Sequence, residues 1–294
     1  MISFRYHLVS IAAVLLALAA GVALGAGPLS ESAKIVGGND STVTSADLNE
    51  LQGFEAAYAK KTGGALVSGK LKGTSVVFFT LPGAQTDQIK ELESAFASAG
   101  AIVAGRVALE RQLVDSKGRQ FAEGVAQQAS KGVEGVSTDG ESYERIGSAL
   151  GRAFLAKETI KPDAAALTIS SAFSEGKLIR LEEKPTSRAQ LAVIVAGPDK
   201  ADSDLGQGEI AASLADAFDL AGKGSLFVGP SASSDDGGYV EDLRSSDAAP
   251  RVSSVDVIDS AAGRLIATLV AARELGGTAG SFGTSRSTDG AIPN

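Results

Sequence analysis

The chain has 294 residues and carries a formal net charge of −8, from 35 Asp and Glu against 27 Lys and Arg. This balance argues against a nucleic-acid partner, because phosphate binding relies on clustered cations. There is no Cys and no Trp, one Met at the initiator, and one His at position 7. We therefore expect no disulfide, no catalytic residue, no enzymatic activity, no metal site and no cofactor, since thiolate, thioether and imidazole groups are missing beyond His7.

An uncharged apolar run near the amino terminus is the first extended feature. Residues 8–27 supply about the 20 apolar residues that a helix needs to cross a bilayer. A signal peptide is the alternative, because small residues around Ala26 offer a cleavage site, but the run exceeds the usual apolar core of a signal sequence. Arg5 precedes the run and acids follow it, so residues 1–7 are predicted to be cytoplasmic. We expect a single-pass plasma-membrane protein whose carboxyl-terminal part lies outside the cytoplasm.

Small residues recur at every fourth position of this predicted anchor. Ala17, Gly21 and Gly25 form a small-xxx-small pattern, which is typical of close helix packing in membranes. Ala and Gly are also frequent in anchors without any packing role. The pattern makes these three residues membrane-packing candidates and leaves a homodimer open.

A short amphipathic helix is predicted after a small, polar stalk at residues 28–44. We assign residues 45–72 to this amphipathic or coiled-coil segment, with Ser45 as the helix cap. Its apolar stripe consists of four helix-pairing candidates, Leu48, Leu51, Phe54 and Tyr58. The stripe could pair with a copy of itself, but it is shorter than the three or four heptads typical of a coiled coil. Packing on its own domain is therefore an equal alternative.

Residues 73–277 are predicted to form an exported α/β domain, because short apolar runs alternate there with helical periodicity. The strand-like runs are residues 75–80, 101–107, 178–181, 191–196, 225–229 and 252–258. The helical segments are residues 87–99, 118–130, 142–157, 162–173, 209–221 and 261–275. Continuous apolar strands are typical of parallel sheets covered on both faces. We expect Rossmann-like layering with a mostly parallel sheet, and leave open whether there is one sheet or two. Residues 278–294, rich in Gly, Ser and Thr, are predicted to be disordered.

Three loops in this domain follow apparent strands, at residues 81–86, 197–208 and 230–238. They are predicted to share the edge at which open α/β sheets bind ligands, although turn chemistry alone explains their Gly and Pro. The letters around Gly206 and Gly208 match G-x-G-x-x-A, but a loop separates them from the preceding strand, which disfavours dinucleotide binding.

Acidic pairs lie in two of these loops. Asp202 with Asp204, and Asp235 with Asp236, could supply oxygen ligands to Ca²⁺ or Mg²⁺. Neither pair has EF-hand spacing, and solvated loop carboxylates are far commoner. We therefore assign no metal ligand.

Three segments resemble the actinobacterial MctB family. They are residues 1–25 (MISFRYHLVSIAAVLLALAAGVALG), the strand at residues 74–82, and the closing stretch at residues 254–277 (SVDVIDSAAGRLIATLVAARELGG). Members are described as copper transport proteins that form channels of the mycobacterial outer membrane. A second description, SteB, makes them single-pass plasma-membrane proteins that work with a membrane partner, SteA, and promote peptidoglycan hydrolase activity in cell division.

The residue types help to choose between these two descriptions. Copper selects sulfur or imidazole ligands, which the predicted exported domain does not contain. We therefore expect a non-enzymatic envelope protein that binds protein partners and, by resemblance, promotes peptidoglycan hydrolase activity together with a SteA-like membrane partner. Copper transport, efflux or channel formation in the envelope, with an outer-membrane location, is the alternative that the resemblance also implies.

Overall fold

The computed structural model describes residues 45–293. The predicted cytoplasmic segment, anchor and stalk, residues 1–44, lie outside the described residues. Residues from Gln52 onward form one compact unit, which contains the whole sheet.

Within the described residues the strands form a single seven-stranded sheet, which answers the question that the sequence leaves open. The strands are β1 (Ser75–Thr80), β2 (Ile102–Leu109), β3 (Ile179–Glu183), β4 (Leu191–Val195), β5 (Gly224–Val228), β6 (Ser253–Val255) and β7 (Ser281–Phe282). Their order is β3-β2-β1-β4-β5-β6-β7. All neighbours are parallel except β2 and β3, which are antiparallel. The prediction of an α/β fold with a mostly parallel sheet is confirmed.

The helices alternate with the strands along the chain. They are α3 (Ser45–Val67), α4 (Thr86–Ser98), α5 (Arg111–Val114), α6 (Arg119–Ala129), α7 (Ser142–Phe154), α8 (Ala164–Glu175), α9 (Gln207–Ala221), α10 (Tyr239–Arg244) and α11 (Ala261–Leu275). Short 3₁₀ turns occur at Ser116–Gly118, Ser203–Leu205 and Ser231–Ser234. The six helices predicted after residue 73 are all present, whereas the short α5 and α10 have no counterpart among the predictions.

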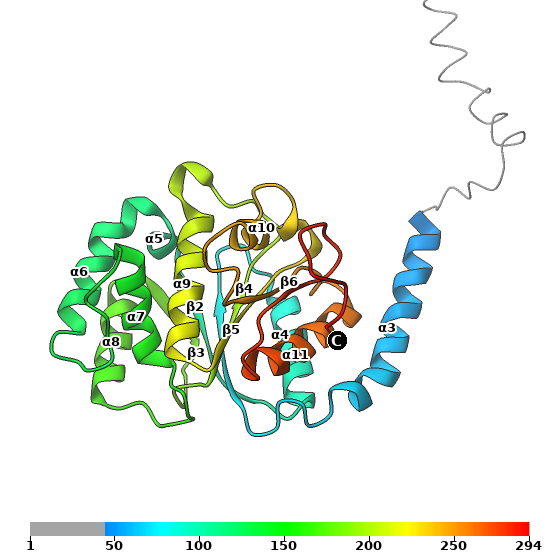
Figure 1. Cartoon of the computed structure of the whole chain (residues 1–294), viewed down its shortest axis with the longest axis horizontal. Helices are drawn as coiled ribbons and strands as arrows, with labels where there is room; N and C mark the ends of the chain where they lie inside the picture. Colours follow the sequence, from blue (N-terminus) through cyan, green and yellow to red (C-terminus); the bar gives the residue numbers. More distant parts are fainter. Residues whose placement is uncertain (1–44, 294) are drawn as a thin grey trace, which may run out of the picture. The chain divides into compact units, whose positions relative to one another are not determined.

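Helices cover both faces of the sheet because successive strand residues point to opposite sides. Val77 and Phe79 of β1 enter a core under α5 to α10, whereas Val76 and Phe78 enter a second core under α4 and α11. Val67, the last residue of α3, joins this second core. Figure 1 shows α4 and α11 on one side of the sheet and α9, with α6, α7 and α8 beyond it, on the other. Burial on both faces explains why the strands are apolar throughout rather than alternating.

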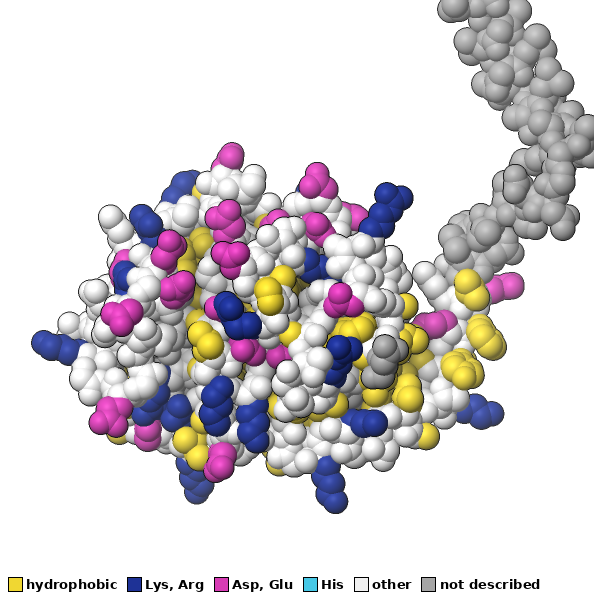
Figure 2. All heavy atoms as spheres, in the orientation of Figure 1, with side chains coloured by type: hydrophobic (Ala, Val, Ile, Leu, Met, Phe, Trp, Pro, Cys, Tyr) yellow, Lys and Arg dark blue, Asp and Glu magenta, His cyan; other side chains and the backbone are white. Residues whose placement is uncertain are grey.

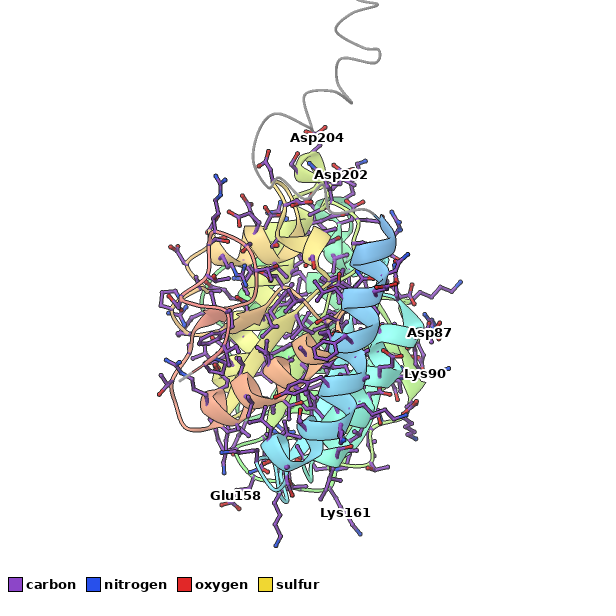
Figure 3. The ribbon with its side chains drawn as sticks, turned by 90° about the vertical axis from the view of Figure 1, so that its right-hand side faces the viewer. Asp87, Lys90, Glu158, Lys161, Asp202 and Asp204 are labelled. Carbon is purple, nitrogen blue, oxygen red and sulfur yellow. The ribbon has the colours of Figure 1, made fainter. Side chains whose placement is uncertain are left out.

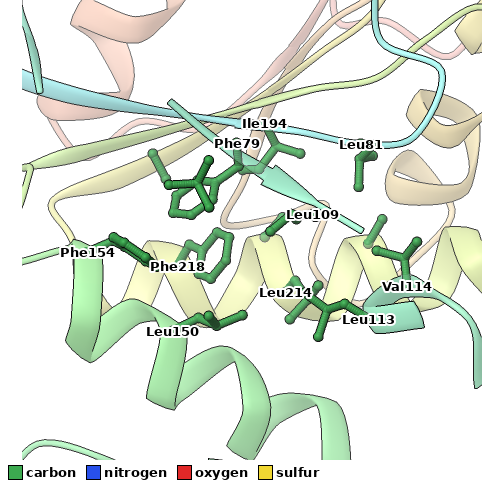
Figure 4. Close-up of a cluster of buried hydrophobic side chains, with 14 of the residues drawn as sticks. Phe79, Leu81, Leu109, Leu113, Val114, Leu150, Phe154, Ile194, Leu214 and Phe218 are labelled. Carbon is green, nitrogen blue, oxygen red and sulfur yellow. The ribbon is translucent and has the colours of Figure 1, made fainter. Parts of the chain in front are cut away.

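Phe79 organises the larger of the two cores. Its ring stacks on Phe218 of α9 with centroids 4.3 Å apart, and meets Phe154 of α7 edge-on at 5.9 Å. Figure 4 shows these three rings with Leu150 and Ile194 between the strand and the two helices. Aromatic pairs in these geometries add about 0.5–1.5 kcal/mol beyond the area that they bury.

Two glycines allow α7 to approach α9 closely. A Cβ at Gly147 would lie 2.5 Å from the Cβ of Ala217, and one at Gly151 would lie 2.6 Å from the Cβ of Ala221. Real Cβ atoms do not come this close, so a larger residue at either position would push the helices apart. The small-xxx-small spacing therefore also occurs at a helix contact in the folded domain, outside the predicted anchor.

The carboxyl-terminal segment corrects one prediction. The sequence predicts disorder for residues 278–294, and this is wrong for the residues described there, because β7 pairs with β6 and the following turn is tied to buried charges. The backbone N–H of Thr284 donates to Asp256 at 2.8 Å, and Arg244 donates to the carbonyl of Phe282 at 3.1 Å. The Gly, Ser and Thr composition of this segment predicts disorder because it offers few apolar side chains to bury. Its order comes instead from hydrogen bonds to residues about 30–40 positions earlier in the chain.

Candidate functional site

Helix α3 packs on the domain through small residues at every fourth position. Ala59 and Val67 are buried, and a Cβ at Gly63 would collide with the side chain of Leu265 on α11. One turn earlier, Glu55 accepts a hydrogen bond from the backbone N–H of Ala262, at the amino-terminal end of α11. Because residues four apart share one helix face, these contacts define the inner face of α3.

The predicted pairing residues lie on the opposite face, which we call the outer face of α3. Leu51, Phe54 and Tyr58 are 62%, 68% and 62% exposed. At 3.6 residues per turn, Phe54 and Tyr58 lie about 140–180° around the helix from Gly63. Their rings are stacked, with centroids 6.2 Å apart. The side chain of Leu48, the fourth predicted member, lies outside the described residues.

The contact between α3 and the rest of its unit is made by small residues and not by Phe54 and Tyr58. Pairing of the stripe with a copy of itself stays a prediction. Figure 2 shows hydrophobic side chains on the surface of α3, and Figure 3 shows that helix lying over α11. Monomeric proteins rarely leave contiguous large apolar side chains in water, so the outer face is the candidate interaction surface.

The predicted membrane-packing residues Ala17, Gly21 and Gly25 lie outside the described residues. Within the described part of the chain, no helix combines the length and the apolar character that crossing a membrane requires.

The three loops that follow strands do meet at one edge of the sheet, as predicted. The backbone N–H of Ala201 donates to the carbonyl of Gly237 at 2.9 Å, and a Cβ at Gly83 would meet the Asp199 carboxylate. Asp202 turns back on its own loop, where its carboxylate accepts from the N–H of Asp204 at 3.1 Å. Figure 3 shows Asp202 and Asp204 at the tip of this edge, far from Glu158 and Lys161 at the other. Among residues 45–293, no three Asp, Glu or His side chains gather as metal ligands would.

A buried ion pair, which the sequence analysis missed, lies where β6 ends. Arg244 of α10 donates to Asp256 at 2.7 Å, and both side chains are almost fully buried. Burial opposes ionisation of Asp256, but hydrogen bonds from Arg244, Thr284 and Ser285 outweigh it and hold the pKa of this carboxyl below its ordinary value. Neither residue stands in a motif, so only their meeting in the fold reveals them.

A second buried carboxyl lies where β6 begins. Glu274 of α11 accepts a hydrogen bond from Ser253, and the half-buried Asp219 of α9 faces it. Burial raises the pKa of Glu274 to about 7, and the charge of Asp219 adds to this increase. Burial also raises the pKa of Asp219, so the environment disfavours ionisation of both carboxyls. Both carboxyls lie at the sheet edge where the strands begin, opposite the three loops that follow strands.

Comparison with known proteins covers nearly the whole chain. A family profile described as "Copper transport outer membrane protein, MctB" matches residues 1–293. Proteins named "Copper transporter MctB" from Mycobacterium tuberculosis H37Rv and Mycobacterium bovis are each 30% identical to it over 308 residues, covering 97% of this chain and 96% of the relative. A protein of the same name from Mycobacterium leprae is 32% identical over 126 residues, or 40% of each chain.

Proposed function

Because the chain belongs to the MctB family, we propose that it is a non-enzymatic component of the cell envelope that acts by binding protein, with the outer face of α3 as its docking surface. The observation that carries this proposal is the exposure of Phe54 and Tyr58 on a helix whose other face is already packed. Aromatic side chains are enriched at protein interfaces, and burying each of these two is worth about 1.5–3 kcal/mol.

The membrane topology and the cellular process belong to the same proposal. Residues 8–27 anchor the chain once in the plasma membrane, residues 1–7 stay in the cytoplasm, and the described domain lies outside it. The resemblance to SteB supports a role in promoting peptidoglycan hydrolase activity at division, together with a SteA-like membrane partner. An anchor, a spacer and a folded binding surface are all that this role requires of the chain.

Copper transport is the second candidate function, and the names of the family and its relatives favour it. Copper here is a cargo, so the question is which side chains hold it. The chain contains no Cys, and its one Met and one His are Met1 and His7. The residues of the described domain therefore do not fit the soft or imidazole coordination that copper prefers. A copper role for this chain rests on a partner protein or on its amino terminus.

A complementation experiment tests the two candidates together. Cells whose own copy is deleted receive the wild-type chain, a Phe54→Ser/Tyr58→Ser variant, or Leu220→Ser as the control. Leu220 is 64% exposed, close to the values for Phe54 and Tyr58, but it lies on α9. We expect the α3 variant to lose peptidoglycan hydrolase activation and daughter-cell separation, and both the control and the wild type to restore them.

Copper tolerance is measured in the same strains. If cells that carry the α3 variant separate normally, the protein-binding proposal is contradicted. If that variant instead accumulates copper and loses tolerance while Leu220→Ser does not, the second candidate is favoured. Titration of the purified chain with Cu(I) adds a direct readout, because stoichiometric micromolar binding that remains after proteolytic removal of residues 1–44, and with them Met1 and His7, contradicts the coordination argument.

A further inference from the structure

We propose that the partner covering the outer face of α3 is the α3 of a second copy of this chain, lying antiparallel to the first. This inference rests on the proposed docking role of the same face and names its occupant. It is carried by the pattern of apolar and charged residues around the helix and by the length of chain that precedes it.

The apolar stripe is complementary to itself in the antiparallel direction. When the midpoint between Phe54 and Tyr58 lies on a twofold axis, each Phe54 faces the Tyr58 of the second copy. The two stacked ring pairs then form one four-ring cluster, and the Leu51 side chain of each copy extends this cluster by one turn along its helix. The inner face remains free to hold α11, because it points about 140–180° away.

The charges beside the stripe fit the same direction. Glu50 and Lys61 are both exposed, and their separation of 11 positions places them within about 20° of each other around the helix. They therefore flank the same edge of the stripe. In an antiparallel pair this edge meets its own copy, so Glu50 faces Lys61 of the second chain, and symmetry repeats the contact. In a parallel pair, the edge of the stripe that carries Glu50 and Lys61 would face the other edge of the second helix, and the contact between Glu50 and Lys61 would be lost.

The chain before α3 is long enough to permit this arrangement from one membrane surface. The 23 residues of α3 span about 35 Å. Residues 28–44 could reach at most about 55–60 Å when fully extended, so two anchored copies can bring their α3 helices together in opposite directions. The pair buries less than the roughly 1,200 Å² of a stable interface. We therefore expect association that depends on the high local concentration that two anchors in one membrane provide.

Position-specific cross-linking tests the proposal, because a chain without Cys carries only the cysteines that are introduced. The full-length Glu50→Cys/Lys61→Cys chain, in membranes, is treated with a short bis-maleimide. We expect a covalent dimer. The matched control is Glu50→Cys/Lys60→Cys, which moves the second thiol by one residue to the side of α3 away from the stripe. Glu50→Cys alone places its two thiols roughly 17 Å apart along an antiparallel pair and should not react across it.

The stripe itself is tested by adding Phe54→Ser to the cross-linking pair. The loss of buried aromatic area should weaken the pairing by about tenfold or more, whereas the thermal unfolding of the domain should not change. Dimer from the Lys60→Cys control, dimer from Glu50→Cys alone, or no effect of Phe54→Ser would each overturn antiparallel pairing. If Glu50→Cys/Lys61→Cys reacts only with a different protein, self-pairing is overturned but α3 remains a protein-docking surface. If it reacts only with lipid, both self-pairing and protein docking on α3 are overturned.

Discussion

The two ends of β6 hold buried carboxyls whose pKa values are shifted in opposite directions. Asp256, where the strand ends, faces the Arg244 guanidinium, and its pKa lies below the ordinary value. Glu274, beside Ser253 where the strand begins, faces another acid, and its pKa is raised to about 7. Burial disfavours the charge at both ends, so the neighbouring side chain decides which carboxyl stays ionised.

This difference also separates two structural roles. The Arg244–Asp256 pair collects hydrogen bonds from the segment after β7 and so holds the end of the chain on the sheet. The pair formed by Glu274 and Asp219 joins α11 to α9 across the start of the strands. We expect the first contact to be lost in acid and the second to weaken as pH rises. The five predictions below test this contrast from the largest effect to the smallest.

Removing the cation from the first pair should have the largest effect. Arg244→Met leaves the buried carboxylate of Asp256 without a cation, which costs about 3–5 kcal/mol of unfolding free energy. The control is Arg251→Met, because Arg251 is 49% exposed and pairs with Asp216. Such a surface pair contributes at most about 1 kcal/mol. Denaturant unfolding measures both variants, and equal costs would show that the buried pair is no different from a surface pair.

The acid pair should produce a pH dependence of the opposite sign. The pKa of Glu274 rises from 4.5 unfolded to about 7 folded, so the folded state keeps a proton that the unfolded state loses. Its contribution is therefore complete below pH 4.5 and is lost as pH rises through 7, an effect of about 2–3 kcal/mol. Glu274→Gln keeps an acceptor for Ser253 and should flatten this slope between pH 5 and 8. If the slope of unfolding free energy against pH is unchanged in Glu274→Gln, other titrating groups cause it.

Asp256 should respond in the other direction. Its folded pKa lies below 3.8, so its contribution is present above that pH and is lost as the pH falls through the folded value. The Glu274→Gln variant should retain this acid-side loss, which allows the two ends of β6 to be separated in one titration.

A backbone substitution should loosen the carboxyl-terminal segment. Gly283 has a φ of +135°, and a Cβ there would collide with the Asp256 carboxylate. Gly283→Ala should cost about 1–2 kcal/mol, and amide hydrogen exchange should increase in β7 and the following turn rather than in β1 or β4. Gly277→Ala is the control, because Gly277 also has a positive φ but nothing lies within 4 Å of a Cβ there. Equal increases of exchange in the two variants would show that the loss of stability comes from backbone strain alone and not from a collision with Asp256.

The smallest effect is expected at Asp163, where a partner is present without burial. Asp163 pairs with Arg152 at 2.6 Å and caps α8 by accepting from the N–H of Ala166 at 2.8 Å. Hydrogen bonds from Arg152 and Ala166 lower its pKa to about 2. Asp163→Ala should cost about 1 kcal/mol, mostly from the lost cap, and Asp163→Asn should cost less because Asn caps helices equally well. A cost for Asp163→Asn near that of Arg244→Met would contradict the importance of burial.

The alternation of strands and helices could be predicted from local patterns. The run at residues 191–196 is apolar at every position and became the central strand β4, and Ser260 caps α11 as its position before an amphipathic segment indicates. The docking residues Phe54 and Tyr58 could also be found, because their spacing places them on one helix face. The direction of that face could not, since it depends on Gly63 meeting Leu265 about 200 residues away.

Composition and periodicity were therefore enough for the fold class, for most helices and strands, and for the lack of copper-binding side chains in the described domain. These are properties of single residues and of neighbours along the chain. The order of the strands, the outward turn of the α3 stripe, the attachment of the carboxyl-terminal segment and the opposite pKa shifts at the two ends of β6 appeared only in the tertiary structure. Each depends on burial and on contacts between distant residues, such as Arg244 with Ser285 and Ser253 with Glu274, for which the sequence carries no local signal.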